Sequence, residues 1–112
     1  MMEKTPGLRE DIFTPTEISY CESKNNKFQH YAARFCAKEA FLKALGTGLI
    51  EKLKFTDIEV YHDTKNKPNI HLGGATEDFS KSKGISKILV SLAHIKDIAK
   101  AVVIIEKDDI KL

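Results

Sequence analysis

Long apolar runs are missing from this sequence of 112 residues. No stretch approaches the roughly 20 apolar residues that a membrane-spanning helix needs. The first residues, MMEKTPGLRE, also lack the apolar centre that a signal peptide has. We therefore expect a cytoplasmic protein that does not enter a membrane.

Cysteine and arginine are scarce as well. The two cysteines, Cys21 and Cys36, do not have the spacing of a metal site, and we expect both to be reduced thiols. Arg9 and Arg34 are the only arginines, so the formal net charge of +2 depends on lysine. A nucleic-acid-binding protein would show more arginine and more basic clustering. We therefore expect no nucleic-acid partner, although a weakly basic surface suits an acidic protein.

What is present is the composition of one globular domain, with 42% hydrophobic and 30% charged residues. We expect residues 1–112 to form a single domain, in which residues 1–8 are a loose tail. The sequence contains no internal repeat, no low-complexity segment and no clear linker. Function must therefore come from residues within this one domain.

Two helices are predicted in the first half of the chain. Thr14 and Glu17 have the spacing of a capping box, and a proline at the first helical position supports a helix over 15–22. A second helix is predicted over 28–45, ending at Gly46 in a left-handed cap. Residues at helical spacing are expected to form its apolar face: Phe28, Tyr31, Ala32, Phe35 and Leu42.

The second half of the chain changes to the alternating pattern of β-strands. The predicted strands are residues 55–62, 69–72, 86–94 and 101–107. The first two are expected to form a hairpin, and the last two, which are rich in β-branched residues, to be buried. A loop with a short helix is expected over 73–84. This order predicts an α+β fold, with one long helix packed on a largely antiparallel sheet.

Glu39 is an unexpected residue within the second helix. At about 100° per residue it lies within about 20° of Phe28, inside the predicted apolar face. Lys43 follows one turn later and is its neighbour on the helix surface. Two explanations are open at this point. The pair could be a simple ion pair at the edge of the core, or Glu39 could bind a cation such as Mg²⁺ while Lys43 holds an anion.

Two further features also have both a structural and a functional explanation. The turn Gly46-Thr47-Gly48 could be a helix cap followed by a loop, or its backbone N–H groups could cradle a phosphate. His94 ends a predicted strand, where it could be a surface residue or an imidazole that donates to a phosphate.

The ordered set of segments resembles a known family. The segments FTPTEISYC, ARFCAKEAFLKALGTG, FTDIEV, NKP, SLAH and AVVIIE are together similar to the holo-acyl-carrier-protein synthases, the small 4′-phosphopantetheinyl transferases. The resemblance extends from Glu10 to Glu106. It implies a Mg²⁺-dependent enzyme of fatty acid biosynthesis that moves the phosphopantetheine arm of coenzyme A to a serine of an acyl carrier protein. It also implies a homotrimer with its sites between subunits.

The resemblance implies roles for individual residues. Glu39 matches the family's metal-binding glutamate, and Lys43 matches the lysine beside the transferred phosphate, so these two would be catalytic. The residues implied to bind coenzyme A are Arg34, Lys38, Gly46, Thr47, Gly48, Lys67, Pro68 and His94.

The chain departs from the family at its start. The family begins with a strand that carries an aspartate metal ligand, whereas GLREDIFTPTE begins where the following helix should end. Asp11 is not expected to replace that ligand, so Mg²⁺ would bind weakly to Glu39 alone. Three explanations stay open: a start further upstream, a partner chain that supplies the missing part, or a non-catalytic member that binds coenzyme A, a nucleotide or a protein. Two departures are smaller. Asn66 replaces the glycine of the family's Gly-Lys-Pro turn, and Ala93 replaces the small hydroxyl residue that precedes the family's histidine.

Overall fold

The computed structural model describes residues 8–46, 53–95 and 98–107. Its elements, in chain order, are α1 (Leu8–Ile12), α2 (Pro15–Glu22), α3 (Lys27–Leu45), the 3-10 turn η2 (Phe55–Asp57), β1 (Ile58–His62), β2 (Pro68–Leu72), α4 (Gly74–Ser82), β3 (Ile85–Ile95) and β4 (Ile98–Lys107). The predicted order of elements is confirmed, with α1 and η2 in addition. Leu8, which the expected tail of residues 1–8 included, begins α1. Residues 1–7 lie outside the described part.

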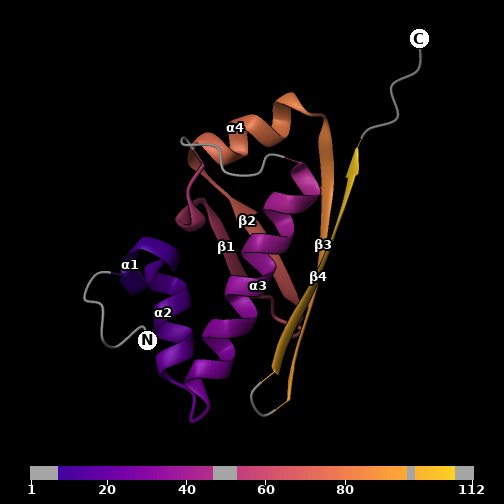
Figure 1. The fold of residues 1–112 in the computed structure, drawn as a ribbon. Coiled ribbons are helices and arrows are strands. Elements are labelled where there is room, and N and C mark those ends of the chain that lie inside the picture. The colour runs from indigo at the N-terminus through magenta and orange to yellow at the C-terminus, as the bar shows by residue number, and fades with distance from the viewer. Residues whose placement is uncertain (1–7, 47–52, 96–97, 108–112) are drawn as a thin grey trace.

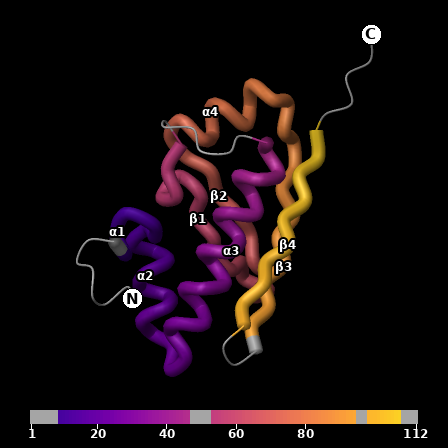
Figure 2. Tube along the Cα trace, viewed as in Figure 1, coloured from indigo at the N-terminus to yellow at the C-terminus, as the bar shows by residue number. Residues whose placement is uncertain are grey.

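The long helix α3 runs through the middle of the molecule (Figure 1). Helices α1 and α2 lie on one side of it and the β3–β4 hairpin on the other, while α4 crosses one end. Both strand pairs are antiparallel hairpins, β1 with β2 and β3 with β4. Figure 2 shows the β3–β4 hairpin lying along α3, which packs against both of its strands. Within the described residues, no helix has both the length and the apolar character needed to cross a bilayer.

Local chemistry explains why the helices begin and end where they do. The Thr14 hydroxyl accepts a hydrogen bond from the Glu17 N–H, and the Thr14 N–H donates to the Glu17 carboxylate, so the predicted capping box is present. At the C-terminal end of α3, Gly46 adopts a φ of +76°, the left-handed conformation predicted for the cap.

Two groups of buried side chains form the interior. Phe13, which follows α1, packs with Cys21 of α2 and Tyr31 of α3. Phe41 and Ile58 join the second half of α3 to the sheets, together with aliphatic side chains of β2, β3 and β4. The predicted apolar face of α3 is confirmed at Tyr31, Phe35 and Leu42, which are buried or pack on the core. It is wrong at Phe28, which is 49% exposed, and at Ala32, which is also exposed.

The β3–β4 hairpin is half-buried on one face and exposed on the other, so the prediction of two buried strands is wrong. Ile98, Val102 and Ile104 lie on one face of β4, with Lys100 between the first two, and these three aliphatic side chains are 52–63% exposed. Leu89 pairs with Ile104 and is 41% exposed, so it lies on the same outer face. This outer face carries these four aliphatic side chains together with the exposed Lys100, and it is open in the single chain.

Candidate functional site

Helix α3 carries four of the predicted site residues, on two different faces. Arg34 and Lys38 are one turn apart and both buried, at 1% and 0% exposed. Glu39 and Lys43 are also one turn apart, but both are exposed. Arg34 and Glu39 differ by five residues, which corresponds to about 140° around a helix. Within one chain these two pairs therefore point in different directions.

The side chains of Glu39 and Lys43 are exposed and do not pack in the core. Glu39 does not lie in the buried stripe of α3, which corrects the expectation that its carboxylate faces the interior. The ion pairs of the described residues do not include one between Glu39 and Lys43. The simple ion-pair explanation is therefore wrong for this structure, and both charged groups are open to solvent and to a ligand.

Lys38 is buried inside the protein, so the prediction that it binds coenzyme A is wrong for this structure. Its ammonium lies 2.8 Å from the Glu17 carboxylate, and both side chains are 0% exposed. It also donates to the carbonyl oxygens of Phe55 (2.9 Å) and Ile58. Burial lowers the pKa of Lys38, and the charge of Glu17 opposes that effect. All of its contacts are internal, so Lys38 cannot reach a phosphate in this structure.

The Glu17 carboxylate accepts two hydrogen bonds in addition to this ion pair. One oxygen accepts from the Thr14 N–H, and the other accepts from the Val60 N–H at 2.7 Å. The capping box of α2 is thereby tied to α3 through Lys38 and to β1 through Val60. This network holds the segment of α3 that carries Glu39.

The glycine turn after α3 is only partly described. The Gly46 N–H donates to the Lys43 carbonyl at 2.9 Å, so it closes the helix and is not free for a phosphate. Thr47 and Gly48 lie outside the described residues. Of the two explanations for the turn, the helix cap is confirmed at Gly46.

The β1–β2 turn is fixed around Lys67, and Pro68 follows as the first residue of β2. The Asp63 carboxylate accepts from the N–H groups of Lys65 and Lys67, both at 2.9 Å, and the Asp63 N–H donates to the Lys67 carbonyl. Asn66 adopts a φ of +63°, which explains how it can replace glycine in this turn. The Lys67 side chain is exposed at the end of the hairpin.

Arg34 and His94 belong to one cluster of basic and aromatic side chains. The rings of His94 and His30 have centroids 5.1 Å apart, His30 lies 5.5 Å from Tyr20, and Tyr20 is stacked on His62 at 5.0 Å. The Arg34 guanidinium lies 4.3 Å from the centre of the Tyr20 ring. We call these five residues the histidine cluster. It brings together α2, α3, β1 and β3.

Hydrogen bonding fixes the state of one ring in the histidine cluster. Arg34 Nη2 lies 3.1 Å from His62 Nδ1. A guanidinium can only donate, so His62 Nδ1 must accept and the ring is the neutral tautomer with its proton on Nε2. Burial lowers the pKa of His62, and the charge of Arg34 lowers it further. Arg34 Nε and Nη1 are buried without a hydrogen-bond partner among the described residues.

A magnesium ion fits Glu39 in donor chemistry. The carboxylate is exposed, has no ion-pair partner among the described residues, and supplies the oxygen ligand that Mg²⁺ prefers. Groups of three or more His, Cys, Asp or Glu side chains placed to hold a metal do not occur within the described ranges. One carboxylate therefore fits a metal whose other ligands are water and substrate oxygens.

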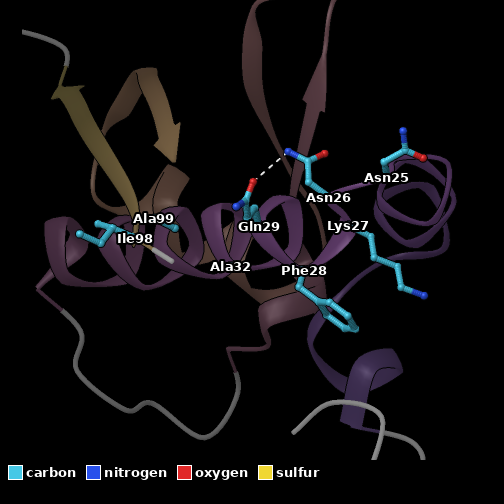
Figure 3. A pocket seen from close by; sticks show the side chains of 8 residues that line it. All are labelled: Asn25, Asn26, Lys27, Phe28, Gln29, Ala32, Ile98 and Ala99. Atoms are coloured by element: carbon cyan, nitrogen blue, oxygen red, sulfur yellow. Dashed lines mark hydrogen bonds between the residues drawn. The ribbon is translucent and has the colours of Figure 1, made fainter. Parts of the chain in front are cut away.

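A separate hollow of about 430 Å³ lies between the start of α3 and the start of β4 (Figure 3). In Figure 3, Phe28 points outward from α3, and Ile98 and Ala99 lie beside the helix. The remaining residues around the hollow are Asn25, Asn26, Lys27, Gln29 and Ala32. It contains no predicted site residue, and its apolar part continues the open aliphatic face of β4.

Comparison with known proteins identifies the class of protein to which this chain belongs. Residues 2–103 match the 4′-phosphopantetheinyl transferase superfamily. Two curated relatives are holo-[acyl-carrier-protein] synthases, from Geobacter sp. strain M21 (42% identical, covering 96% of this chain and 86% of the relative) and Geobacter sulfurreducens (45% identical, covering 89% and 79%). The chain therefore belongs to the 4′-phosphopantetheinyl transferase superfamily, as a member of its holo-[acyl-carrier-protein] synthases.

Solved structures agree with this assignment. The holo-[acyl-carrier-protein] synthase of Neisseria meningitidis superposes with a TM-score of 0.84 at 32% identity, covering 95% of this chain and 85% of that one. The enzyme of Helicobacter pylori, solved in complex with coenzyme A, superposes with a TM-score of 0.74 at 31% identity, covering 87% and 79%. The predicted family, α+β fold and phosphopantetheinyl transferase function are confirmed.

Sequence reasoning missed three members of the histidine cluster. His30 precedes Arg34 by one helical turn, so the spacing alone could have placed the two together. Tyr20 and His62 reach the cluster only through the packing of α2 and β1 against α3, and no local pattern reveals that contact.

Proposed function

We propose that this chain carries out its transfer with Mg²⁺ held at Glu39 and with Lys43 beside the transferred phosphate. The observation that carries this proposal is the exposure of both side chains, one turn apart on α3 and not paired with each other. The acceptor is a serine of an acyl carrier protein, the donor is coenzyme A, and the reaction belongs to fatty acid biosynthesis in the cytoplasm. The free thiols Cys21 and Cys36 suit a reducing compartment.

Charge neutralisation is the central chemical requirement of the reaction. The serine hydroxyl oxygen forms a bond to the phosphorus that carries the pantetheine arm, while the bond to the leaving phosphate of 3′,5′-ADP breaks and the hydroxyl proton is released. A bound Mg²⁺ would act as a Lewis acid on the diphosphate oxygens. The Lys43 ammonium offsets negative charge on the transferred phosphate.

The nucleotide phosphates are assigned to the other basic residues. Arg34 and His94 belong to the histidine cluster. Lys67 lies in a turn whose shape Asp63 fixes, and Pro68 follows it at the start of β2. Lys38 is not assigned to a phosphate, because its ammonium is buried in an ion pair with Glu17.

We also propose that the protein is a homotrimer with its sites between subunits. Glu39 and Arg34 point in different directions on α3, so a second copy could bring the two groups of site residues to one ligand. The aliphatic outer face of Leu89, Ile98, Val102 and Ile104 would be covered in such an assembly.

Mass spectrometry of an apo acyl carrier protein tests the catalytic proposal. After incubation with coenzyme A, Mg²⁺ and this chain, the carrier should gain one phosphopantetheine arm. Glu39→Gln should lower the rate by about a hundredfold or more, because it removes the charge that holds the metal. Asp78→Asn is a matched control, since it neutralises an exposed carboxylate on α4. Normal transfer by Glu39→Gln would refute the metal role.

Light scattering after size exclusion tests the assembly. Val102→Lys places a charge in the aliphatic outer face and should shift the protein to a smaller species, whereas Asp78→Lys on α4 should not. A monomeric wild-type protein with full activity would contradict the proposal.

A further inference from the structure

A second hollow, of about 310 Å³, lies between α4 and the strands β2 and β3. Helix α4 connects the end of β2 to the start of β3, and the two strands lie beside each other without forming a ladder (Figure 1). The volume is at the lower end of the range for small-molecule sites, about 300–1,000 Å³. Among the described residues, none that is assigned above to the transfer or to coenzyme A lines this hollow.

Ser80 of α4 lines the hollow and has a hydroxyl without a partner. The residue is 3% exposed, and its Oγ makes no hydrogen bond to the described part of the chain. The neighbouring hydroxyls of α4 are satisfied: Thr76 donates to the Asp57 carboxylate at 3.1 Å, and Ser82 donates to the Phe79 carbonyl at 2.6 Å. Buried hydroxyls are normally hydrogen-bonded, so Ser80 is an unused donor at the wall of this hollow.

The outer edge of β2 supplies backbone donors to the same hollow. The Gly73 N–H donates to the Asp57 carbonyl at 2.9 Å, and the bond at the β1–β2 turn follows the same odd-numbered pattern. Hydrogen-bonded pairs alternate along an antiparallel ladder, so the odd-numbered residues of β2 bond to β1. The N–H groups of Ile70 and Leu72 therefore point away from β1. Within the described ranges, β2 forms no ladder on that side.

The side chains around the hollow combine positive charge with aliphatic carbon. Lys81 and Lys87 are exposed, and Lys81 lies 3.6 Å from the Glu77 carboxylate in a surface pair. Two lysines against one glutamate leave the lining with a net charge of +1, with its histidine counted as neutral. Ile85 and Ile88 of β3 are partly buried and form the aliphatic part. Donors and positive charge beside aliphatic carbon fit a molecule with an anionic head and a short apolar body.

We propose that this hollow is a second ligand site, which binds a small aliphatic carboxylate. The carboxylate oxygens accept from the Ser80 hydroxyl and from the edge N–H groups of β2, and the ammonium groups of Lys81 and Lys87 offset the negative charge. The aliphatic chain lies against Ile85 and Ile88, where its apolar surface is removed from water. The site goes beyond the proposed function, because no step of the transfer uses it.

Nuclear magnetic resonance titration of the isotope-labelled chain with sodium hexanoate tests the site. The amide resonances of Ile70, Leu72 and Ser80 should shift along one saturating curve, with a Kd in the millimolar range because so small a ligand gains little binding energy. Sodium acetate has the same head without the apolar body and should bind about tenfold more weakly or worse. Hexylammonium chloride has the same body with the opposite charge and should leave these resonances in place.

Matched variants separate the contributions of the hydroxyl and the charge. Ser80→Ala should raise the Kd for hexanoate by about three- to tenfold. The free Ser80→Ala protein should nevertheless melt no lower than the wild type, because the hydroxyl has no described partner to lose. Lys87→Gln should also raise the Kd by about three- to tenfold. Lys83→Gln changes an exposed lysine outside the lining and should bind hexanoate like the wild type.

The results that would overturn the proposal are distinct from a failure of the transfer. Shifts confined to Glu39 and Lys43 would place hexanoate at the transfer site. Equal binding of acetate or hexylammonium would show that the hollow does not select an aliphatic anion. An unchanged Kd in Ser80→Ala or Lys87→Gln, a lower melting temperature of free Ser80→Ala, or no shift at millimolar hexanoate would also refute the site.

Discussion

Lys38 and Lys43 lie on either side of Glu39 on α3, and replacing each with methionine should have different effects. Lys38→Met should lower the stability of the protein, whereas Lys43→Met should lower the rate of transfer. Lys38→Met removes an ammonium that is 0% exposed and lies 2.8 Å from an equally buried carboxylate of Glu17. It also leaves the carbonyl oxygens of Phe55 and Ile58 without this donor. Breaking a buried ion pair from one side costs about 3–5 kcal/mol, since the remaining charge is uncompensated. The methionine fills nearly the same volume, so the loss measures charge more than packing.

The predicted loss is large for a domain of this size. Domains have a free energy of unfolding of about 5–15 kcal/mol, and 1 kcal/mol moves the melting temperature by about 4 °C. Lys38→Met should therefore melt about 12–20 °C below the wild type in calorimetry or circular dichroism. Lys43→Met, an exposed substitution on the same helix, should change the free energy of unfolding by about 0.5 kcal/mol or less while reducing transfer.

A double variant separates charge from packing. Glu17→Gln removes the buried negative charge, so the combined Glu17→Gln and Lys38→Met variant should be more stable than the sum of the two single losses predicts. Additive losses would show that the unpaired carboxylate is not the cause. A Lys38→Met protein that melts within about 2 °C of Lys43→Met would refute the structural role of Lys38 altogether.

Two further predictions concern positions outside the ion pair. Gly74→Ala should destabilise the protein by about 1–3 kcal/mol in chemical denaturation, because Gly74 has a φ of +56° and a Cβ there would lie 2.7 Å from an Asp57 carboxylate oxygen. A variant as stable as the wild type would contradict this close approach. Burial raises the pKa of Cys21 to about 11, so at pH 8 this thiol should be alkylated far more slowly in the native protein than in denaturant. Equal rates in the two states would show that the thiol is accessible.

Local chemistry allowed much of the fold to be predicted. The capping box at Thr14 and the left-handed glycine at Gly46 depend on residues within one turn of each other, and both ends are where the pattern placed them. The period change after α3 likewise identified the strands. The family segments are contiguous, so the class of enzyme was also available from the sequence.

The sequence could not decide which side of α3 is covered. Helical spacing shows which residues share a face, but the covered face depends on partners distant in the chain. Arg34 and Lys38 are inside because His62, Glu17 and the carbonyl groups beside β1 receive them. Glu39 could therefore be assigned to the apolar face from a count of residues and still be exposed.

The functional site also combines features set by neighbouring residues with features set by contacts between distant segments. By itself, the sequence determined the order of elements, the helix ends and the family motif, because each depends on neighbouring residues. Only the tertiary structure decided that Lys38 is part of the interior, that Glu39 and Lys43 are open, and that histidines from α3, β1 and β3 meet around Arg34. Burial and charge pairing are set by contacts between distant segments, and those contacts exist only once the chain has folded.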